Sequence, residues 1–199
     1  LLWLESASAF ARLEVVTTTT DLAAIVAEVG GGEVVVTSIG KGTQDPHYVE
    51  AKPSFMTRVG KADLVVAVGL DLEIGWLPSV LRGARNPKVL PGGRGYLEVG
   101  PALDPIEVPD RKVTRAEGDV HPFGNPHFYL DPDRVGSAAQ LIAERLGTLD
   151  ASHASDFTSR ATALAERLNA KAKAWQERVT RSDVKYVVTY HKTLNYFLD

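Results

Sequence analysis

The sequence predicts an α/β fold, in which parallel strands alternate with the helices that cover them. Short runs rich in β-branched and apolar residues at 13–18, 33–39 and 63–68 have the composition of strands. Each run is followed by apolar residues at helical spacing, at 22–29, from about residue 53, and at 74–81. The run 63–68 is almost continuously apolar, which is typical of a parallel strand covered on both faces.

The first half of the chain offers clear signals for where these elements start and stop. Asp21 is predicted to cap the first helix, and the glycines at 30–32 are predicted to end it. A loop rich in turn-forming residues at 40–46 follows the second strand and leads to His47. Residues 86–124 contain scattered prolines and glycines, so we predict a long surface connection there, with a short strand-like run at 88–90.

Two helices are predicted in the second half. Asp131 is expected to cap the first of them, Pro132 lies in its first turn, and Gly147 is expected to end it. From Ser152 a second helical pattern continues for roughly 28 residues, which would span about 40 Å. A helix of that length suits a rigid spine between two lobes, and the run 184–189 after it is predicted to be a new buried strand.

The predicted organisation therefore has two Rossmann-like lobes. One strand cannot form a sheet, so the second lobe is expected to be truncated in this chain. Residues 12–150 form the N-terminal α/β lobe, 151–182 the spine helix, and 183–199 the start of the C-terminal lobe. Residues 1–11 are interpreted as the remnant of a signal peptide, because Ala7-Ser8-Ala9 and Ala9-Phe10-Ala11 have the form of a cleavage site. An ordinary amphipathic first segment is the alternative.

Composition excludes several classes of function. The net charge of −3 is spread along the chain, so no basic stripe for nucleic acid and no polybasic membrane patch is expected. The absence of cysteine excludes disulfides, thiolate zinc sites and cysteine nucleophiles. Common catalytic motifs are also missing, and Gly40-Lys41-Gly42-Thr43 lacks the spacing of a phosphate-binding loop. Any metal site must therefore use histidine and carboxylate.

Three of the five histidines lie in similar surroundings. His47, His127 and His191 each adjoin the predicted end of a strand, and the first two follow a proline. Ligands of open α/β sheets gather at the carboxyl edge of the strands, where residues distant in sequence can meet. Three imidazoles and one carboxylate complete a tetrahedral zinc shell. The alternative is that each histidine is an isolated turn or surface residue.

Several stretches, taken together, resemble the zinc and manganese solute-binding proteins of ABC importers, the ZnuA-like and TroA-like family. They occur in the family's order from about residue 13 to the end of the chain. The matching stretches are Leu13 to Asp21, Asp45 to Glu50, Ala62 to Val65 with Gly69 and Leu72-Glu73, Asn125 to Pro132, and Tyr190-His191 with Tyr196-Phe197.

This resemblance implies a periplasmic binding protein, not an enzyme, with a metal ion between two lobes. It implies that His47, His127 and His191 are ligands and that an Asp or Glu beyond residue 199 is the fourth. Because manganese-preferring relatives often carry a carboxylate in place of His191, Zn²⁺ is expected rather than Mn²⁺. The expected partner is the membrane permease of the importer, and the full-length protein is expected to be a monomer. Manganese binding, a histidine-ligated zinc hydrolase and a metal-dependent adhesin are the alternatives.

Further residues have weaker interpretations. His121 is close to His127 in the sequence and is predicted to be a loop residue that could hold metal transiently on its way to the site. Glu50, three residues after His47, could support that histidine from outside the metal shell, with a solvated glutamate as the alternative. His153 is predicted to face solvent.

Overall fold

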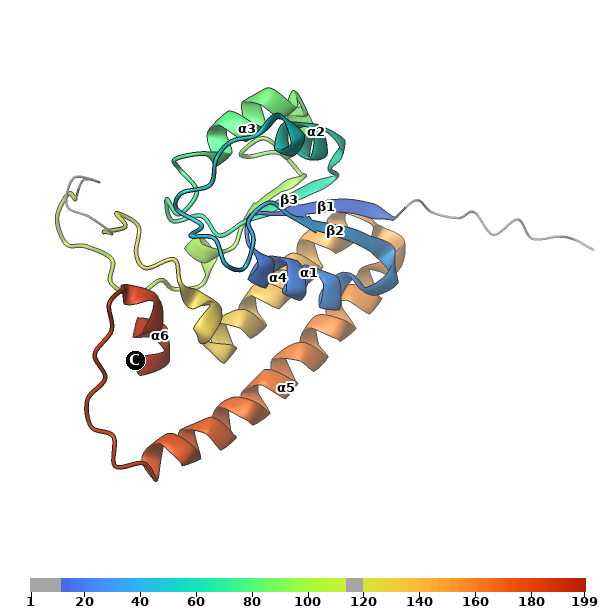
Figure 1. Ribbon diagram of the computed structural model, residues 1–199. Coiled ribbons are helices and arrows are strands. Elements are labelled where there is room, and N and C mark those ends of the chain that lie inside the picture. Colours follow the sequence, from blue (N-terminus) through green and yellow to red (C-terminus); the bar gives the residue numbers. More distant parts are fainter. Residues whose placement is uncertain (1–11, 114–119) are drawn as a thin grey trace, which may run out of the picture.

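The computed structural model describes residues 12–113 and 120–199, which are arranged around a parallel sheet (Figure 1). The four strands lie in the order β2-β1-β3-β4. Parallel pairing joins β1 to β2, β1 to β3 and β3 to β4, so the predicted α/β class is confirmed. The strands are β1 (Leu13–Thr17), β2 (Val34–Ser38), β3 (Leu64–Ala67) and β4 (Tyr96–Glu98). The predicted signal-peptide remnant, residues 1–11, lies outside the described residues.

Helices cover both faces of the sheet (Figure 1). Successive side chains of a strand point to opposite faces. Val15 of β1 accordingly belongs to one apolar cluster and Val16 to a second one on the other side. The first cluster involves α1 (Thr20–Gly30), α4 (Pro132–Leu149) and α5 (Ala154–Thr180), and the second involves α2 (Pro53–Lys61) and α3 (Leu77–Ala84). No helix in the described part of the chain is both long and apolar enough to cross a membrane.

Two predicted helix boundaries are wrong for identifiable reasons. Thr19, not Asp21, caps α1, because its hydroxyl accepts a hydrogen bond from the backbone nitrogen of Leu22 at 3.4 Å. Gly147 does not end α4, which continues to Leu149. A Cβ atom at position 147 would lie 3.1 Å from the Cβ atom of Ala154, so this glycine allows α4 and α5 to pack closely.

The predicted surface connection at 86–124 contains a strand of the sheet. Strand β4 pairs with β3, and both Tyr96 and Leu97 are buried. The strand-like run at 88–90 is wrong, since residues Pro87–Val89 form a 3-10 turn. The side chain of Asn86 holds this turn by accepting from the backbone nitrogen of Lys88 and donating to the carbonyl oxygens of two residues at the end of α2.

The long helix predicted from Ser152 is present as α5, although the chain that follows it differs from the prediction. The first half of α5 buries Phe157 against the core, whereas Trp175 in the second half is 42% exposed. The predicted strand at 184–189 is wrong, because no strand of the described residues lies beside it, and Val188 is 98% exposed. The chain returns to the core at α6 (Asn195–Leu198), where Tyr196 is buried (Figure 1).

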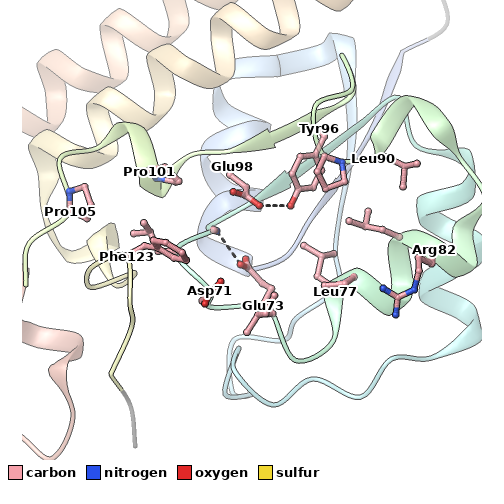
Figure 2. A pocket seen from close by; sticks show the side chains of 16 residues that line it. Asp71, Glu73, Leu77, Arg82, Leu90, Tyr96, Glu98, Pro101, Pro105 and Phe123 are labelled. Atoms are coloured by element: carbon pink, nitrogen blue, oxygen red, sulfur yellow. Dashed lines mark hydrogen bonds between the residues drawn. The ribbon is translucent and has the colours of Figure 1, made fainter. Parts of the chain in front are cut away.

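The loop after β3 is anchored by a buried carboxyl group, Glu73, which is 3% exposed. Its oxygens accept hydrogen bonds from the Thr18 hydroxyl at 2.6 Å and from the backbone nitrogens of Val68 and Gly69 at 2.8 and 3.0 Å. Burial raises the pKa of Glu73 to about 7 despite these hydrogen bonds. Figure 2 shows Glu73 at the wall of a cavity of about 590 Å³.

Candidate metal centre

His47 lies in the loop after β2, at the carboxyl edge of the sheet, and is held there by Asp45. The backbone nitrogen of His47 donates to Asp45 Oδ1 at 2.9 Å, and its Nδ1 lies 2.6 Å from the same oxygen. Because a carboxylate only accepts, Nδ1 carries the proton, and Nε2 is the nitrogen that can bind a metal. Partial burial acts to raise the pKa of Asp45, but the hydrogen bonds from His47 hold it below its usual value.

His127 is the innermost of the three predicted ligands. It precedes α4, its backbone nitrogen donates to Asn125 Oδ1 at 3.0 Å, and its side chain is buried, with the residue 3% exposed. Neither ring nitrogen has a hydrogen-bond partner among the residues that the structure describes. Burial, followed by the nearby imidazoles of His191 and His47, lowers the pKa of His127 to about 3. The ring is therefore neutral near pH 7, which is the form that binds metals.

His191 reaches the same place from the far end of the chain. Its Nδ1 lies 2.8 Å from the hydroxyl of Thr193, so a metal bond would use Nε2. The next residue, Lys192, is fixed on both sides: its ammonium group lies 3.2 Å from Glu107, and its carbonyl oxygen accepts from the Asn125 side chain at 3.0 Å. These contacts bring the segment after α5 against the loop that carries His127.

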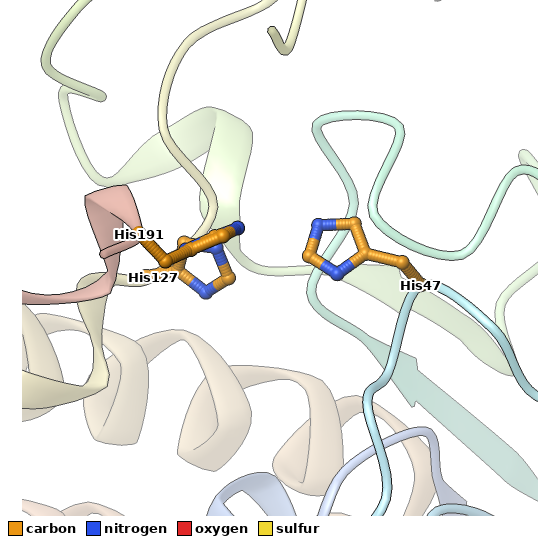
Figure 3. A group of neighbouring side chains, drawn as sticks. All are labelled: His47, His127 and His191. Carbon is orange, nitrogen blue, oxygen red and sulfur yellow. The ribbon is translucent and has the colours of Figure 1, made fainter. Parts of the chain in front are cut away.

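The three histidines converge, as Figure 3 shows. Their ring centroids are 5.5 Å apart for His47 and His127, 5.8 Å for His47 and His191, and 4.9 Å for His127 and His191. One nitrogen from each ring lies within 4.8 Å of those of the other two. Nitrogens that share a tetrahedral zinc ion lie about 3.3 Å apart, given a Zn–N bond of about 2.0 to 2.1 Å. The cluster therefore needs only a modest contraction to surround an ion.

The accessory residues are placed differently from one another. The Nε2 atom of His121 lies 3.1 Å from that of His47, so this loop residue belongs to the histidine cluster. Glu50 is exposed and pairs with Lys52 at 3.5 Å, while Asp45 is the carboxylate that contacts His47. Sequence reasoning missed Asp45, although an Asp two residues before a turn residue is a recognisable hydrogen-bonding pattern.

His153 lies apart from the cluster, at the start of α5. The prediction that it faces solvent is wrong in part, because its ring is only 26% exposed. Its Nδ1 atom lies 2.6 Å from Asp150 Oδ2, and its Nε2 atom lies 3.7 Å from a carboxylate oxygen of Glu33. The hydrogen bond to Asp150 raises the pKa of His153.

Comparison with known proteins identifies a protein family and several relatives that this chain resembles. The family model described as "Zinc-uptake complex component A periplasmic" matches residues 15–199. The manganese ABC transporter substrate-binding lipoprotein scaA of Streptococcus gordonii is 27% identical over 195 residues, which are 96% of this chain and 59% of that protein. A putative metal-binding protein of Treponema pallidum is 27% identical over 189 residues, or 93% of this chain and 58% of its own length. The chain thus spans less than two thirds of these relatives.

Solved structures share the fold. A zinc-bound deletion mutant of ZnuA superposes with a TM-score of 0.76 at 21% identity, covering 94% of this chain and 65% of that one. The manganese-bound periplasmic metal binding protein of Candidatus Liberibacter asiaticus gives 0.75 at 21% identity, with the same coverage of both chains. Since the family model covers nearly the whole chain, the chain belongs to the ZnuA family of periplasmic metal-binding proteins of ABC importers, which are not enzymes.

Proposed function

We propose that the protein captures a divalent metal ion outside the cytoplasm and delivers it to the membrane permease of an ABC importer. The observation that carries this proposal is the convergence of His47, His127 and His191, whose ring nitrogens lie within 4.8 Å of one another. His127 gives the strongest support, because both of its nitrogens are buried without a partner in the described residues. Such groups cost about 1 to 3 kcal/mol each unless something binds them, and a metal ion would bind one of these nitrogens directly.

Zinc is the ion that these donors favour. Imidazole nitrogen suits zinc, whereas manganese prefers oxygen ligands. The carboxylate of Asp45 also accepts a hydrogen bond from His47 Nδ1. Carboxylates that bind the second ring nitrogen in this way orient the histidine ligands of zinc. The similar proteins include some described with zinc and others with manganese, so the argument for zinc rests on the donor set.

The remaining parts of the proposal concern the whole protein. We expect an Asp or Glu beyond residue 199 to be a further ligand, supplied by a second lobe that begins at about residue 183. Residues 12–150 would form the first lobe and 151–182 the spine between the two. The exposed apolar side chains of the spine and of residues 184–190 support a covering lobe; they are Trp175, Val179, Val184, Tyr186, Val187, Val188 and Tyr190. Residues 1–11 would direct export to the periplasm, where the full-length protein would act as a monomer.

Calorimetric titration of the full-length protein with zinc and with manganese tests this function. The variants are His47→Ala, His127→Ala and His191→Ala, and the matched control is His153→Ala, whose ring lies apart from the cluster. We expect one zinc ion per protein, weaker zinc binding in each of the three variants, unchanged binding in the control, and weaker binding of manganese. If the three variants bind zinc as the wild type does, the site is misassigned. If manganese binds more tightly than zinc, the choice of metal is wrong.

A further inference from the structure

A fourth histidine lies against the cluster. The ring centroid of His121 is 5.1 Å from that of His47 and 6.2 Å from that of His127. Its Nε2 atom is 3.1 Å from the Nε2 atom of His47, the nitrogen that is expected to bind the metal. Four of the five histidines of the chain therefore gather at one place.

The distance between the Nε2 atoms of His47 and His121 is close to the distance between two nitrogens bound to one zinc ion. Two nitrogens bound to one tetrahedral zinc ion lie about 3.3 Å apart. His47 and His121 are already at nearly this separation, whereas the nitrogens of the three predicted ligands are up to 4.8 Å apart. Binding one ion through both His47 and His121 would therefore require little change in the separation of these two nitrogens, with each ring turning so that its lone pair points at the ion.

The chemistry of His47 is consistent with a shared ion. Asp45 fixes the proton on Nδ1 of His47, so Nε2 presents a lone pair toward His121. In the metal-free protein, the His121 ring can donate an N–H hydrogen bond to that lone pair. When an ion binds, the proton on Nε2 of His121 must move to Nδ1 of the same ring, which leaves a lone pair on Nε2 for the ion.

The position of His121 is set by contacts outside the cluster. Gly124 has a φ angle of +103° and donates from its backbone nitrogen to the carbonyl oxygen of His121 at 3.3 Å. A Cβ atom at position 124 would lie 2.8 Å from Pro105 and 3.0 Å from the carbonyl oxygen of Ile106, so the turn is packed closely on these residues and depends on glycine. Asn125 also donates from its backbone to Ile106 at 2.9 Å. The chain thus folds back so that positions 121 and 127 both adjoin His47.

We propose that His121 is a fourth imidazole ligand of the metal ion, in addition to His47, His127 and His191. This inference rests on the proposed function and extends its ligand set. Four nitrogens complete a tetrahedral zinc shell from residues of this chain alone, and they strengthen the preference for zinc over manganese. If a carboxylate beyond residue 199 also binds, the shell becomes five-coordinate instead of tetrahedral.

Nuclear magnetic resonance of the full-length protein with ¹⁵N-labelled histidine identifies the ligands directly. Long-range ¹H–¹⁵N spectra show which ring nitrogens move to the metal-bound position when zinc is added. We expect four of the histidines in residues 1–199 to respond in the wild type and three in His121→Asn, with His153 unaffected in both. Zinc affinity, measured by competition with a chelator, should fall at least about 10- to 100-fold in His121→Asn. Mutating a residue that only hydrogen-bonds to a metal ligand already lowers metal affinity by this factor. His153→Asn is the matched control and should bind zinc as the wild type does.

The outcomes separate this inference from the function on which it rests. If zinc shifts only His47, His127 and His191 in the wild type, His121 is not a ligand, while the proposed function stands. If zinc shifts none of the four, both the ligand set and the proposed function fail. The wild-type spectrum decides this without any dependence on how well a variant folds.

Discussion

Replacing the buried ring of His127 should affect stability with opposite signs in the presence and absence of zinc. A neutral imidazole carries one donor and one acceptor, and here both are buried without a partner in the described residues. Each unsatisfied group costs about 1 to 3 kcal/mol, and a leucine of similar size removes both. With about 1.5 kcal/mol taken for each of the two groups and about 1 kcal/mol allowed for imperfect packing, His127→Leu should raise the unfolding free energy of the metal-free protein by about 2 kcal/mol.

Zinc should reverse this order. A ligand that binds only the folded state stabilises it by about 4.1 kcal/mol when its free concentration is about 1,000 times the dissociation constant. The wild type should gain this amount, whereas His127→Leu has lost a ligand and should gain little. The wild type should therefore become the more stable protein by about 2 kcal/mol.

Urea unfolding in chelator and in buffered zinc measures both effects. The dependence of the unfolding free energy on urea must be the same in the two proteins for the comparison to hold. His153→Leu, at a histidine apart from the cluster, should gain as much from zinc as the wild type. A His127→Leu protein that is less stable in chelator would refute the argument from unsatisfied nitrogens, and one that gains fully from zinc would refute the ligand role.

Three other substitutions test separate parts of the structure. Because burial raises the pKa of Glu73 from 4.5 to about 7, the folded state binds the extra proton and its stability should fall as pH rises through this window. Between pH 4.5 and about 7, the wild type should lose about 3 kcal/mol of unfolding free energy relative to Glu73→Gln. If urea unfolding gives the same pH dependence of unfolding free energy for both proteins, this prediction is contradicted. Asp45→Asn should weaken zinc binding about 10- to 100-fold in a chelator competition, since it replaces the carboxylate that accepts from His47 Nδ1 with a neutral amide; unchanged affinity would show that Asp45 has no such role. Phe157→Ala should lower the unfolding free energy by about 3 to 5 kcal/mol because its side chain is fully buried, and an effect no larger than that of Trp175→Ala, at an exposed position, would be inconsistent with the packing.

The α/β core could be predicted because its signals are local and strong. The apolar run at 63–68 and the helical spacing that follows each strand decide both the class and most of the elements. Strand β4 was not predicted, because it is only three residues long and follows Gly93 and Gly95. Three residues are too few to show the alternation of apolar and polar side chains that marks a strand. The run at 184–189 has the composition of a strand, but a strand also needs a neighbour, which composition cannot supply.

The candidate site depends on contacts that no local pattern contains. Three of the five histidines could be singled out because they adjoin predicted strand ends, but the assignment of His47, His127 and His191 as ligands came from resemblance to a family. In the structure, Glu107 and Asn125 join the segment that carries His191 to the loop that carries His127. These hydrogen bonds link positions 67 and 85 residues apart, so spacing alone could not reveal them.

The same limit applies to the residues around the ligands. The pairing of Asp45 with His47 could be found in the sequence, since the two are separated by one residue. The approach of His121 to His47 could not, because 74 residues separate them. Nor could the burial of Glu73, whose partner Thr18 lies at the end of a different strand.

The most direct test of the metal centre is an anomalous diffraction map of zinc-loaded crystals, recorded on both sides of the zinc absorption edge. We expect one strong peak at about 2.0 to 2.1 Å from a ring nitrogen of each of His47, His127 and His191. A peak elsewhere, or one that contacts fewer than three of these rings, would contradict this ligand set.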